Sequence, residues 1–498
     1  MRLLGEIAHV CRRGLPVPAA CGEIAALLRR AVPDWTWIGI RAGDAWVAEL
    51  GTRGDARACR HATRILVGGE CAGEIAVESV RPEAAESAEA LILERVAELL
   101  AEAWLAARPL GPATRAIHAH ETLHEGIDPV GFPIIPAATY DFRDLEEMRR
   151  VLADGSTGYL YSRWGNPTVR TAEAKIRSLE GAEESLLFSS GMGAISAVLL
   201  SLLRQGDTVV ASAALYGETL RLLGRLDRWG IAVQYVEPAD FHRIAGFLPP
   251  RTRAVWFEPL VNPTLRLVDP RPIARACRAA GAISVADNTF ASPHNLRPLA
   301  YGIDLVVHSL TKYLSGHGDL TGGCVSGSRA AIAQIEPMRR SLGATLSAFD
   351  AFLVSRGLKT FALRMKQHAA GASQVAAFLA GHPRVRRVLY PGLASHPDQA
   401  LAGEILATPG GMVTFEVDGG QPAAEALVGR LALCRCAASL GGIETLVSLP
   451  VLSSHYGFDD AQLAGAGISR GMVRLSVGLE DPEDVIADLR QALGSGPG

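Results

Sequence analysis

Only four of the 498 residues are lysines, so a reaction that needs a lysine amine has few candidates. One of them, Lys312, follows the apolar segment DLVVHS within HSLTKYLSGHGD (residues 308–319), with Ser309 and Thr311 beside it. A lysine at the end of a strand can form a Schiff base with a carbonyl compound while neighbouring hydroxyls bind a phosphate. Spacing alone also fits an ordinary surface lysine. The other three lie in helical patterns, on solvated faces or without an anion-binding neighbour: Lys175, Lys359 and Lys366.

Two further segments place ligand-binding groups near the ends of strands. Asp287 ends the apolar segment AISVAD, and a carboxylate at the carboxyl end of a strand can reach a ligand in the crevice there. If that ligand is pyridoxal phosphate, the carboxylate keeps the pyridine nitrogen protonated and makes the ring an electron sink. The turn SSGMGAIS (residues 189–196) leads into a helix whose first backbone N–H groups form an anion site. Each segment alone also fits an ordinary turn or helix cap.

The elements that would position these groups alternate from about residue 168 onward. Helical stretches such as MGAISAVLLSLL and PIARACRAA separate short apolar strands, which are predicted at SLLFSS, DTVVAS, IAVQYVE, RAVWFEP, AISVADN and DLVVHS. Continuous apolar strands that alternate with helices favour a parallel sheet covered on both faces, an α/β domain. The last ~130 residues mix strands (GMVTFEV, GMVRLSVG) with helices, which predicts a smaller α+β domain.

The first 108 residues form a separate predicted unit. An amphipathic helix at PAACGEIAALLRRAV precedes four strand candidates and a closing helix from about Ser87 to Ala107. The segment ARPLGPATR, with Pro109 and Pro112, is typical of a linker. The pattern GGECAGEIAVES together with the closing helix resembles a GAF domain, a small α/β fold that senses ligands or dimerises. The predicted domains are therefore residues 1–108, 109–365 and 366–498.

The composition excludes several classes of protein. With 49 basic and 52 acidic residues the net charge is −3, which does not indicate a nucleic-acid-binding surface. No uncharged apolar run approaches the ~18 residues of a membrane span, and Glu6 and His9 interrupt what would be the apolar core of a signal peptide. The eight cysteines are scattered without a CxxC pair, as in a reduced compartment. We therefore expect a cytoplasmic protein that binds neither nucleic acid nor membrane.

The three chemical segments belong to an ordered series of motifs across about residues 112–496. The series is YLYSRWGNPT, SSGM, LYGET, FEPLVNPT, ADNTFASP, HSLTKYLSGHGD, RGLKT, SLGGIETL and GMVRLSVGLED. By these motifs the chain resembles the Cys/Met-metabolism family of pyridoxal-phosphate enzymes, which includes the cystathionine γ-lyases, cystathionine γ-synthases and methionine γ-lyases. The resemblance implies an aspartate-aminotransferase-like large domain of fold type I with a mostly parallel sheet, and a smaller α+β C-terminal domain.

The resemblance implies pyridoxal phosphate as the cofactor and assigns residues to it. Lys312 would hold the cofactor and shuttle protons, and Asp287 would pair with the pyridinium. Tyr216 would stack on the ring and act as an acid–base group, and a nearby guanidinium would lower the pKa of its phenol. In this family the YxYSR segment reaches into the neighbouring subunit, so Tyr161 and Arg163 would complete the phosphate site there. The remaining phosphate ligands would be Gly191, Met192, Ser309 and Thr311.

On the substrate side, the resemblance implies that Arg474 clamps the α-carboxylate, with Asn262 and Ser439 assisting at the carboxylate and at the cofactor's phenolic oxygen. Two further residues bear on which substrate is bound. Methionine γ-lyases typically carry a cysteine where Glu218 stands, and Glu444 in SLGGIETL looks more like the cystathionine enzymes. Glu218 would form a charge pair with the distal ammonium group of cystathionine.

These features predict γ-elimination on a sulfur amino acid, as in a cystathionine γ-lyase, giving 2-oxobutyrate, ammonia and a thiol. A γ-replacement synthase, such as a cystathionine γ-synthase or homoserine sulfhydrylase, shares every catalytic residue named above, and a methionine γ-lyase is a further alternative. A regulatory sensor with a retired enzyme domain would be expected to have lost Lys312, Asp287 or Arg474, and all three are present.

The resemblance also bears on partners and metals. It implies a small amino-acid substrate and a homo-oligomer, namely a dimer with shared active sites that assembles further into a tetramer. Three histidines have a spacing that a metal site could use, His118, His120 and His124. Because the family uses no metal, we expect no metal site.

Overall fold

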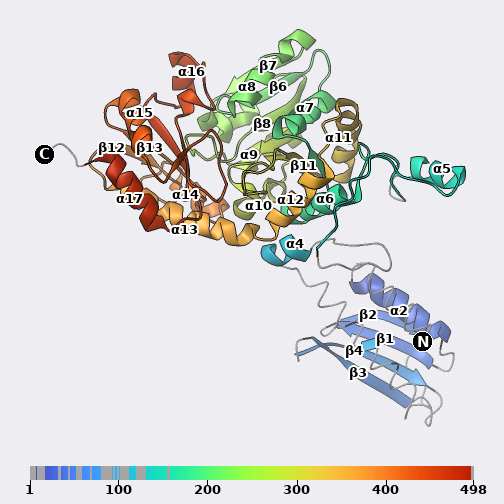
Figure 1. The fold of residues 1–498 in the computed structure, drawn as a ribbon. Coiled ribbons are helices and arrows are strands. Elements are labelled where there is room, and N and C mark those ends of the chain that lie inside the picture. The colour runs from blue at the N-terminus through green and yellow to red at the C-terminus, as the bar shows by residue number, and fades with distance from the viewer. Residues whose placement is uncertain are drawn as a thin grey trace. The chain divides into compact units, whose positions relative to one another are not determined.

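The computed structural model describes residues 111–118, 131–153 and 158–494, together with the regular elements of the first 110 residues (Figure 1). In that first part the described residues are 17–31, 35–42, 45–51, 59–67 and 70–79, with single positions at 7, 92, 96, 97 and 100. The chain divides into two compact units, Met1–Leu110 and Gly111–Gly498. Within the described ranges no helix is long and apolar enough to cross a membrane, and no group of three or more acidic, histidine or cysteine side chains could hold a metal ion. His120 and His124 lie outside the described residues.

The first unit contains an antiparallel sheet with one helix against it. Helix α2 (Val17–Ala31) buries Cys21, Ile24 and Leu28 at the spacing of one helix face, and it packs against β1 and β2. The sheet order is β2-β1-β4-β3, with bounds Trp35–Ala42 (β1), Ala45–Gly51 (β2), Cys59–Val67 (β3) and Glu70–Ser79 (β4). These elements overlap the predicted helix and strands, and β3 begins four residues before its predicted segment TRILVGG. Most of the predicted closing helix lies outside the described residues, and the GAF-like identity of this unit stays a prediction.

A seven-stranded sheet forms the centre of the second unit. From β10 through β9, β8 and β6 to β7 the neighbouring strands are parallel, whereas β11 is antiparallel to β10 and to β5. The six predicted apolar segments form six of these strands, and the α/β prediction is confirmed. The sheet order is β5 (Glu184–Phe188), β11 (Gly323–Gly327), β10 (Leu305–Ser309), β9 (Ile283–Asp287), β8 (Thr252–Phe257), β6 (Thr208–Ser212), β7 (Ala232–Val236).

Both faces of this sheet are buried, as its continuous apolar strands require. On β6, Val209 and Ala211 belong to one apolar cluster and Val210 to another, because alternate side chains of a strand point to opposite faces. The helices that pack on the sheet are α6 (Pro167–Glu180), α7 (Gly191–Leu202), α9 (Pro270–Ala280) and α11 (Arg329–Leu342), and α12 (Ala348–Leu358) packs on α6. Shorter elements are α5 (Leu145–Ala153), α8 (Gly217–Leu223), α10 (Ser292–Asn295) and the 3₁₀ helices η2 (Leu226–Trp229), η3 (Pro238–Phe247) and η4 (Pro298–Tyr301).

Helix α13 (Phe361–Ala380) connects this large domain to a smaller α+β domain. Its first turns place Phe361 and Met365 in the core of the large domain, and later turns place Ala372 and Leu379 in that of the small domain. The predicted boundary at 365/366 therefore falls inside a helix. The small-domain sheet runs β12 (Val385–Leu389), β13 (Met412–Val417), β16 (Met472–Ser476), β15 (Leu446–Ser448), β14 (Arg435–Cys436). Around it lie α14 (Gln399–Ile405), α15 (Gly420–Arg430), η5 (Pro450–Leu452), α16 (Asp460–Gly465) and α17 (Pro482–Leu493).

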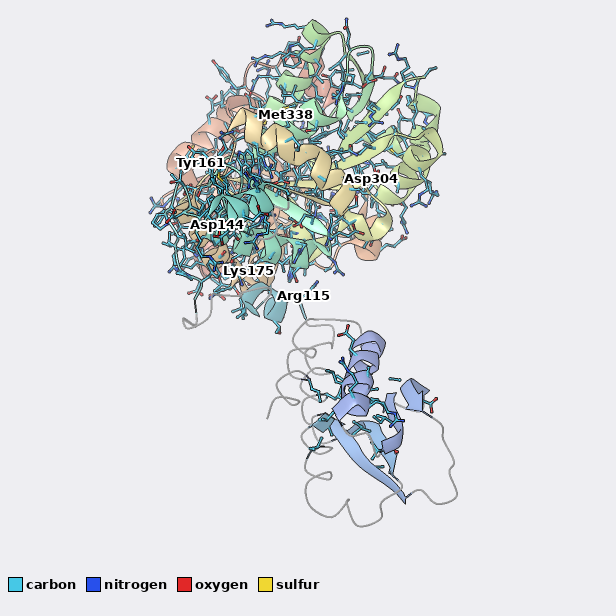
Figure 2. All side chains as sticks on the ribbon, turned by 90° about the vertical axis from the view of Figure 1, so that its right-hand side faces the viewer. Arg115, Asp144, Tyr161, Lys175, Asp304 and Met338 are labelled. Carbon is cyan, nitrogen blue, oxygen red and sulfur yellow. The ribbon has the colours of Figure 1, made fainter. Side chains whose placement is uncertain are left out.

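The side chain of Lys175 is buried, which corrects its predicted place on a solvated helix face. Its Nζ donates to the carbonyl oxygens of Ala116 (3.3 Å) and Ile117 (2.8 Å), in the last turns of α4 (Pro112–His118). A cation is favourable at a helix C-terminus, where carbonyl groups lack intrahelical partners. From the same helix, Arg115 donates to the Ser178 carbonyl at 2.6 Å; Lys175 and Arg115 are labelled in Figure 2. Lys175 therefore anchors α4 to α6.

Candidate active site

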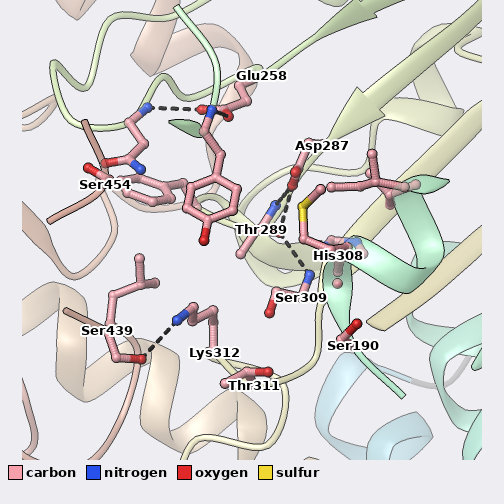
Figure 3. Close-up of a pocket in the computed structure, with 18 of the residues that line it drawn as sticks. Ser190, Glu258, Asp287, Thr289, His308, Ser309, Thr311, Lys312, Ser439 and Ser454 are labelled. Carbon is pink, nitrogen blue, oxygen red and sulfur yellow. Dashed lines mark hydrogen bonds between the residues drawn. The ribbon is translucent and has the colours of Figure 1, made fainter. Parts of the chain in front are cut away.

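The carboxyl ends of β9 and β10 and the first turn of α7 border a cavity of about 320 Å³ (Figure 3). Residues 438–440 and 453–454 and β16 line it from the small domain, and loops of the large domain contribute the rest of its wall. The crevice outside the carboxyl ends of parallel strands is where open α/β sheets bind ligands. The lining includes Ser190, Gly191, Met192, Tyr216, Glu258, Asn262, Asp287, Thr289, His308, Ser309, Thr311, Lys312, Ser439, Ser453, Ser454 and Arg474.

Lys312 reaches this cavity from a tight turn that follows β10. Its backbone N–H donates to the Ser309 carbonyl at 3.3 Å, and its Nζ donates to Ser439 Oγ at 2.9 Å. Burial, and secondarily the Arg474 guanidinium, lowers the pKa of Lys312 to about 8. About a tenth of this amine is therefore neutral at pH 7, and the neutral form is the one that attacks a carbonyl.

Asp287, the last residue of β9, is a partly buried carboxylate, and its hydrogen bonds to described residues leave one oxygen open. Its Oδ1 accepts from the backbone N–H (3.1 Å) and the hydroxyl (2.6 Å) of Thr289, and Thr289 Oγ1 also accepts from the Ser309 N–H at 2.9 Å. Burial raises the pKa of Asp287, partly opposed by the Thr289 bonds and by His308. A cationic ligand group beside Asp287 would favour its ionised form.

The first turn of α7 offers an anion site. Ser190 caps the helix by accepting the Gly193 N–H at 3.0 Å, while the N–H groups of Gly191 and Met192, as first residues of the helix, have no intrahelical acceptor. Thr311 Oγ1 accepts the Gly322 N–H at 3.0 Å and donates to the Gly322 carbonyl oxygen at 3.5 Å, a long contact that an anion could replace. Together with Ser309, these groups converge on one end of the cavity.

Arg474 is a buried guanidinium with two neutral partners. On β16, its Nη1 donates to Asn262 Oδ1 at 3.0 Å and its Nη2 to the Ser439 carbonyl at 3.1 Å. Burial lowers its pKa to about 10. No described carboxylate forms an ion pair with Arg474, so an anionic ligand would satisfy a charge that the chain itself leaves unpaired.

Tyr216 lines the cavity at the N-cap position of α8. Its pKa is raised, chiefly by burial and then by the Glu218 carboxylate, while Arg221 and Arg474 act in the opposite direction. The two guanidinium groups thus lower the pKa of the Tyr216 phenol as expected, but burial and Glu218 raise it by more. The phenol therefore stays protonated at neutral pH and can donate a proton.

Glu258 also lines the cavity, although it was not among the residues predicted from the sequence. It is buried, and its two carboxylate oxygens accept the backbone N–H groups of Tyr216 (2.6 Å) and Asn262 (3.0 Å). Burial, and then the neighbouring Asp287, raises its pKa well above the usual range. Glu258 thereby fixes two cavity residues that are distant in sequence. The available signal was its place after β8 in FEPLVNPT.

Four residues of the predicted site do not line the cavity of this chain. Arg163 donates to the Arg340 carbonyl at 2.9 Å and lies 5.6 Å from the ring centroid of Tyr161, and both are exposed. Glu218 forms an ion pair with Arg221 on α8. Glu444 is exposed in the loop before β15. The other ten line the cavity: Lys312, Tyr216, Asp287, Gly191, Met192, Ser309, Thr311, Arg474, Asn262 and Ser439.

The groups around the cavity fit pyridoxal phosphate. They combine a partly neutral lysine amine, a partly buried carboxylate with one open oxygen and a helix N-terminus with hydroxyls. The anion site at the start of α7, which we call the α7 cradle, also depends on glycine. A Cβ at Gly191 would lie 3.2 Å from Ser309 Cβ, and a Cβ at Gly323 would clash with the Ser190 carbonyl oxygen. A side chain at either position would fill or distort the anion site.

Comparisons with known proteins agree with this chemistry. The model of a family described as Cys/Met metabolism PLP-dependent enzyme matches residues 113–494. An L-methionine γ-lyase of Pseudomonas putida is 43% identical over 392 residues, covering 77% of this chain and 97% of that protein. A cystathionine γ-synthase of Mycobacterium bovis is 39% identical over 386 residues, with the same coverage of 77% and 97%.

Solved structures show the same relationship. A cystathionine γ-synthase from Xanthomonas oryzae pv. oryzae, solved in complex with cystathionine, has a TM-score of 0.72 at 37% identity and covers 77% of this chain and 98% of its own. A Campylobacter jejuni protein described as an O-acetylhomoserine (thiol)-lyase, solved with a pyridoxyl-lysine monophosphate, has a TM-score of 0.74 at 29% identity, covering 77% and 100%. The chain therefore belongs to the Cys/Met-metabolism family of pyridoxal-phosphate enzymes and is a PLP-dependent enzyme of its carbon–sulfur lyase and γ-synthase group.

Proposed function

We propose that the protein catalyses γ-elimination on a sulfur amino acid with a short, uncharged γ-substituent, as L-methionine has, and releases 2-oxobutyrate, ammonia and a thiol. The main support for this proposal is the distribution of charged residues around the cavity. Arg474 is the one guanidinium among its described lining residues, and the rest of the small-domain wall is uncharged: Ala438, Ser439, Leu440, Ser453 and Ser454. Such a wall suits one α-carboxylate and an apolar tail better than a substrate with charges at both ends.

This proposal departs from the cystathionine substrate that the sequence favoured. That preference depended on Glu218 facing the distal ammonium group, but the Glu218 carboxylate is paired with Arg221 outside the cavity. Glu444 is exposed and does not line the cavity either. The similarity to a methionine γ-lyase, at 43% identity, also supports a methionine-like substrate.

The chain's own residues would divide the work of substrate binding and proton transfer. Pyridoxal phosphate, held by Lys312, Asp287 and the α7 cradle, would supply an electron sink for charge that develops on the substrate carbons. Arg474 would orient the α-carboxylate through its guanidinium. Lys312, with a pKa of about 8, would take the proton from Cα. Tyr216, protonated at neutral pH, would donate a proton to the leaving sulfur.

Replacement of the γ-substituent by a thiol is the second candidate. The relatives at 39% and 37% identity that are cystathionine γ-synthases support it. The same residues serve both reactions, so the outcome depends on whether a thiol reaches the substrate before the product leaves. A change of about 1.4 kcal/mol between these two barriers alters the product ratio tenfold.

The proposal extends to the assembly and to the first unit. Tyr161 and Arg163 are exposed and lie away from their own cavity, which supports a homodimer in which they complete the phosphate site of the neighbouring subunit, and a tetramer built from such dimers. The antiparallel sheet and α2 support a GAF-like module that senses a ligand or dimerises. A cytoplasmic location is consistent with the buried cysteines Cys277, Cys324 and Cys434, none of which forms a disulfide among the described residues.

A substrate panel tests the proposal. The holoenzyme would be assayed with methionine, cystathionine and an O-acylhomoserine, each with and without added thiol, for oxo acid, ammonia and thioether. We expect kcat/KM for methionine to exceed that for cystathionine by about tenfold or more, a difference of ~1.4 kcal/mol. Efficient cystathionine cleavage would restore the cystathionine γ-lyase interpretation. Thioether formation with little oxo acid from methionine would assign the synthase.

A further inference from the structure

Arg221, on α8 of the large domain, connects that helix to a turn of the small domain formed by residues 453–458. Its guanidinium pairs with Glu218 and donates to the backbone carbonyl of Tyr456, and its Cζ lies 5.9 Å from the ring centroid of Phe458. The turn is internally bonded, since the Tyr456 N–H donates to the Ser453 carbonyl at 3.3 Å and the Phe458 N–H to the His455 carbonyl at 3.2 Å. The contacts that Arg221 makes with Tyr456 and Phe458 therefore also restrict the position of Ser453.

The helix and the 453–458 turn meet beside the cavity. Tyr216 precedes α8 and lines the cavity from one domain, while Ser453 and Ser454 line it from the other; Ser454 is labelled in Figure 3. The approach is so close that a Cβ at Gly217 would clash with the Ser454 carbonyl oxygen. Because no side chain separates the two backbones, any movement of the turn away from α8 widens the cavity beside Tyr216.

An arginine side chain is well suited to fix the 453–458 turn against α8. A guanidinium that donates to a carbonyl makes a charge-assisted, directional hydrogen bond, and its flat face can also contact an aromatic ring. Glu218, three residues earlier on the helix, orients the guanidinium toward the turn. The half-exposed ion pair by itself contributes little, so the link depends on the contacts to Tyr456 and Phe458.

We propose that Arg221 is a positioning residue that sets the width of the cavity beside Tyr216, where the γ-substituent lies, and thereby limits the substituent's size. The proposal rests on the γ-elimination proposed above, in which Tyr216 protonates the leaving sulfur. Glu218 acts on substrate choice through Arg221 and does not contact the substrate.

The link itself is tested by amide hydrogen exchange in the holoenzyme. Arg221→Gln removes the charge and shortens the reach, Arg221→Lys keeps the charge, and Arg225→Gln is the matched control because Arg225 is exposed and has no described contact with the turn. We expect exchange in residues 453–458 to be about tenfold faster in Arg221→Gln, since local opening becomes easier, intermediate in Arg221→Lys and unchanged in Arg225→Gln. Unchanged exchange in Arg221→Gln would overturn the link.

The size limit is tested with a series of S-alkyl homocysteines from methyl to butyl. In Arg221→Gln the ratio of kcat/KM for the butyl compound to that for methionine should rise about fivefold, mainly through KM, with Arg221→Lys between it and wild type. Faster exchange with an unchanged ratio would overturn the size limit. If the wild-type enzyme does not turn over methionine, the proposed function fails, and the exchange comparison still decides whether Arg221 holds the turn.

Discussion

The Lys312 amine donates to Ser439 Oγ at 2.9 Å, which is a hydrogen bond from the large domain to the small domain. The backbone of the same serine accepts from Arg474 Nη2 at 3.1 Å, and Arg474 Nη1 returns to Asn262 of the large domain at 3.0 Å. The amine that holds the cofactor and the guanidinium proposed to bind the substrate therefore share one neighbour. Their relative position depends on both domains being in place.

Replacement of Lys312 by alanine should abolish both attachment of the cofactor and proton transfer from Cα. We expect kcat/KM to fall by about 10³-fold or more, a loss of ~4 kcal/mol in transition-state stabilisation. Borohydride reduction of the wild type, followed by peptide mass analysis, should place the cofactor on Lys312. The exposed Lys366 is the control, and Lys366→Ala should remain active. Label on Lys175, Lys359 or Lys366 would contradict the assignment.

The rate at which the apoenzyme takes up pyridoxal phosphate should depend on pH through Lys312. The pKa of its amine is lowered to about 8, and only the neutral amine attacks the aldehyde, so the reactive fraction rises with pH and levels off above the pKa. We expect the rate to rise about tenfold per pH unit below pH 7.5 and to be flat above about pH 9. Arg474→Gln removes a neighbouring cation and should move the midpoint to higher pH. Stopped-flow absorbance measures both, and a rate independent of pH would refute the assignment.

Glu258→Gln should impair catalysis although Glu258 makes no predicted contact with the reacting atoms. The amide would present an NH₂ group to one of two backbone N–H donors, on Tyr216 or on Asn262, and would displace that residue. We expect kcat/KM to fall by about 10- to 100-fold, equivalent to roughly 1.4–2.8 kcal/mol. Glu237→Gln, at an exposed position after β7, should have no effect. Full activity of Glu258→Gln would show that the two loops hold their positions without it.

Subunit mixing tests whether Arg163 serves the neighbouring site. Arg163→Ala and Lys312→Ala should each be nearly inactive as homo-oligomers, because each active site lacks one of the two residues. After subunit exchange, one site of every heterodimer contains both residues, so up to about a quarter of wild-type activity should return for random mixing. Proven exchange without recovery of activity would exclude the shared site.

The motif residues could be predicted because their chemistry is local in sequence. Lys312, Ser309 and Thr311 lie within four residues of one another at the end of a strand, and Asp287 ends the strand next to it. Six strands were evident because they are continuous apolar runs. The seventh, β11, begins and ends with glycine, which has low strand propensity, and only its antiparallel pairing with β10 and β5 identifies it as a strand.

The residues that were misplaced depend on tertiary partners. Nothing near Lys175 in the sequence reveals that carbonyl groups of α4, 58 and 59 positions away, accept from its amine. Glu258 is bonded to an N–H 42 positions away. Glu218 is different, because Arg221 follows it at the i,i+3 spacing of a helical ion pair, and this signal was present in LYGETLRLL.

Helix α13, which supplies residues to two apolar cores, should make the second unit unfold as one cooperative unit. Because α13 supplies Phe361 and Met365 to one core and Ala372 and Leu379 to the other, neither core can lose its packing without exposing apolar surface of the same helix. Loss of either core thus removes support from its neighbour. In scanning calorimetry, residues 111–494 should give one endotherm whose van't Hoff and calorimetric enthalpies agree. Two resolved transitions would show that the two halves of α13 unfold separately.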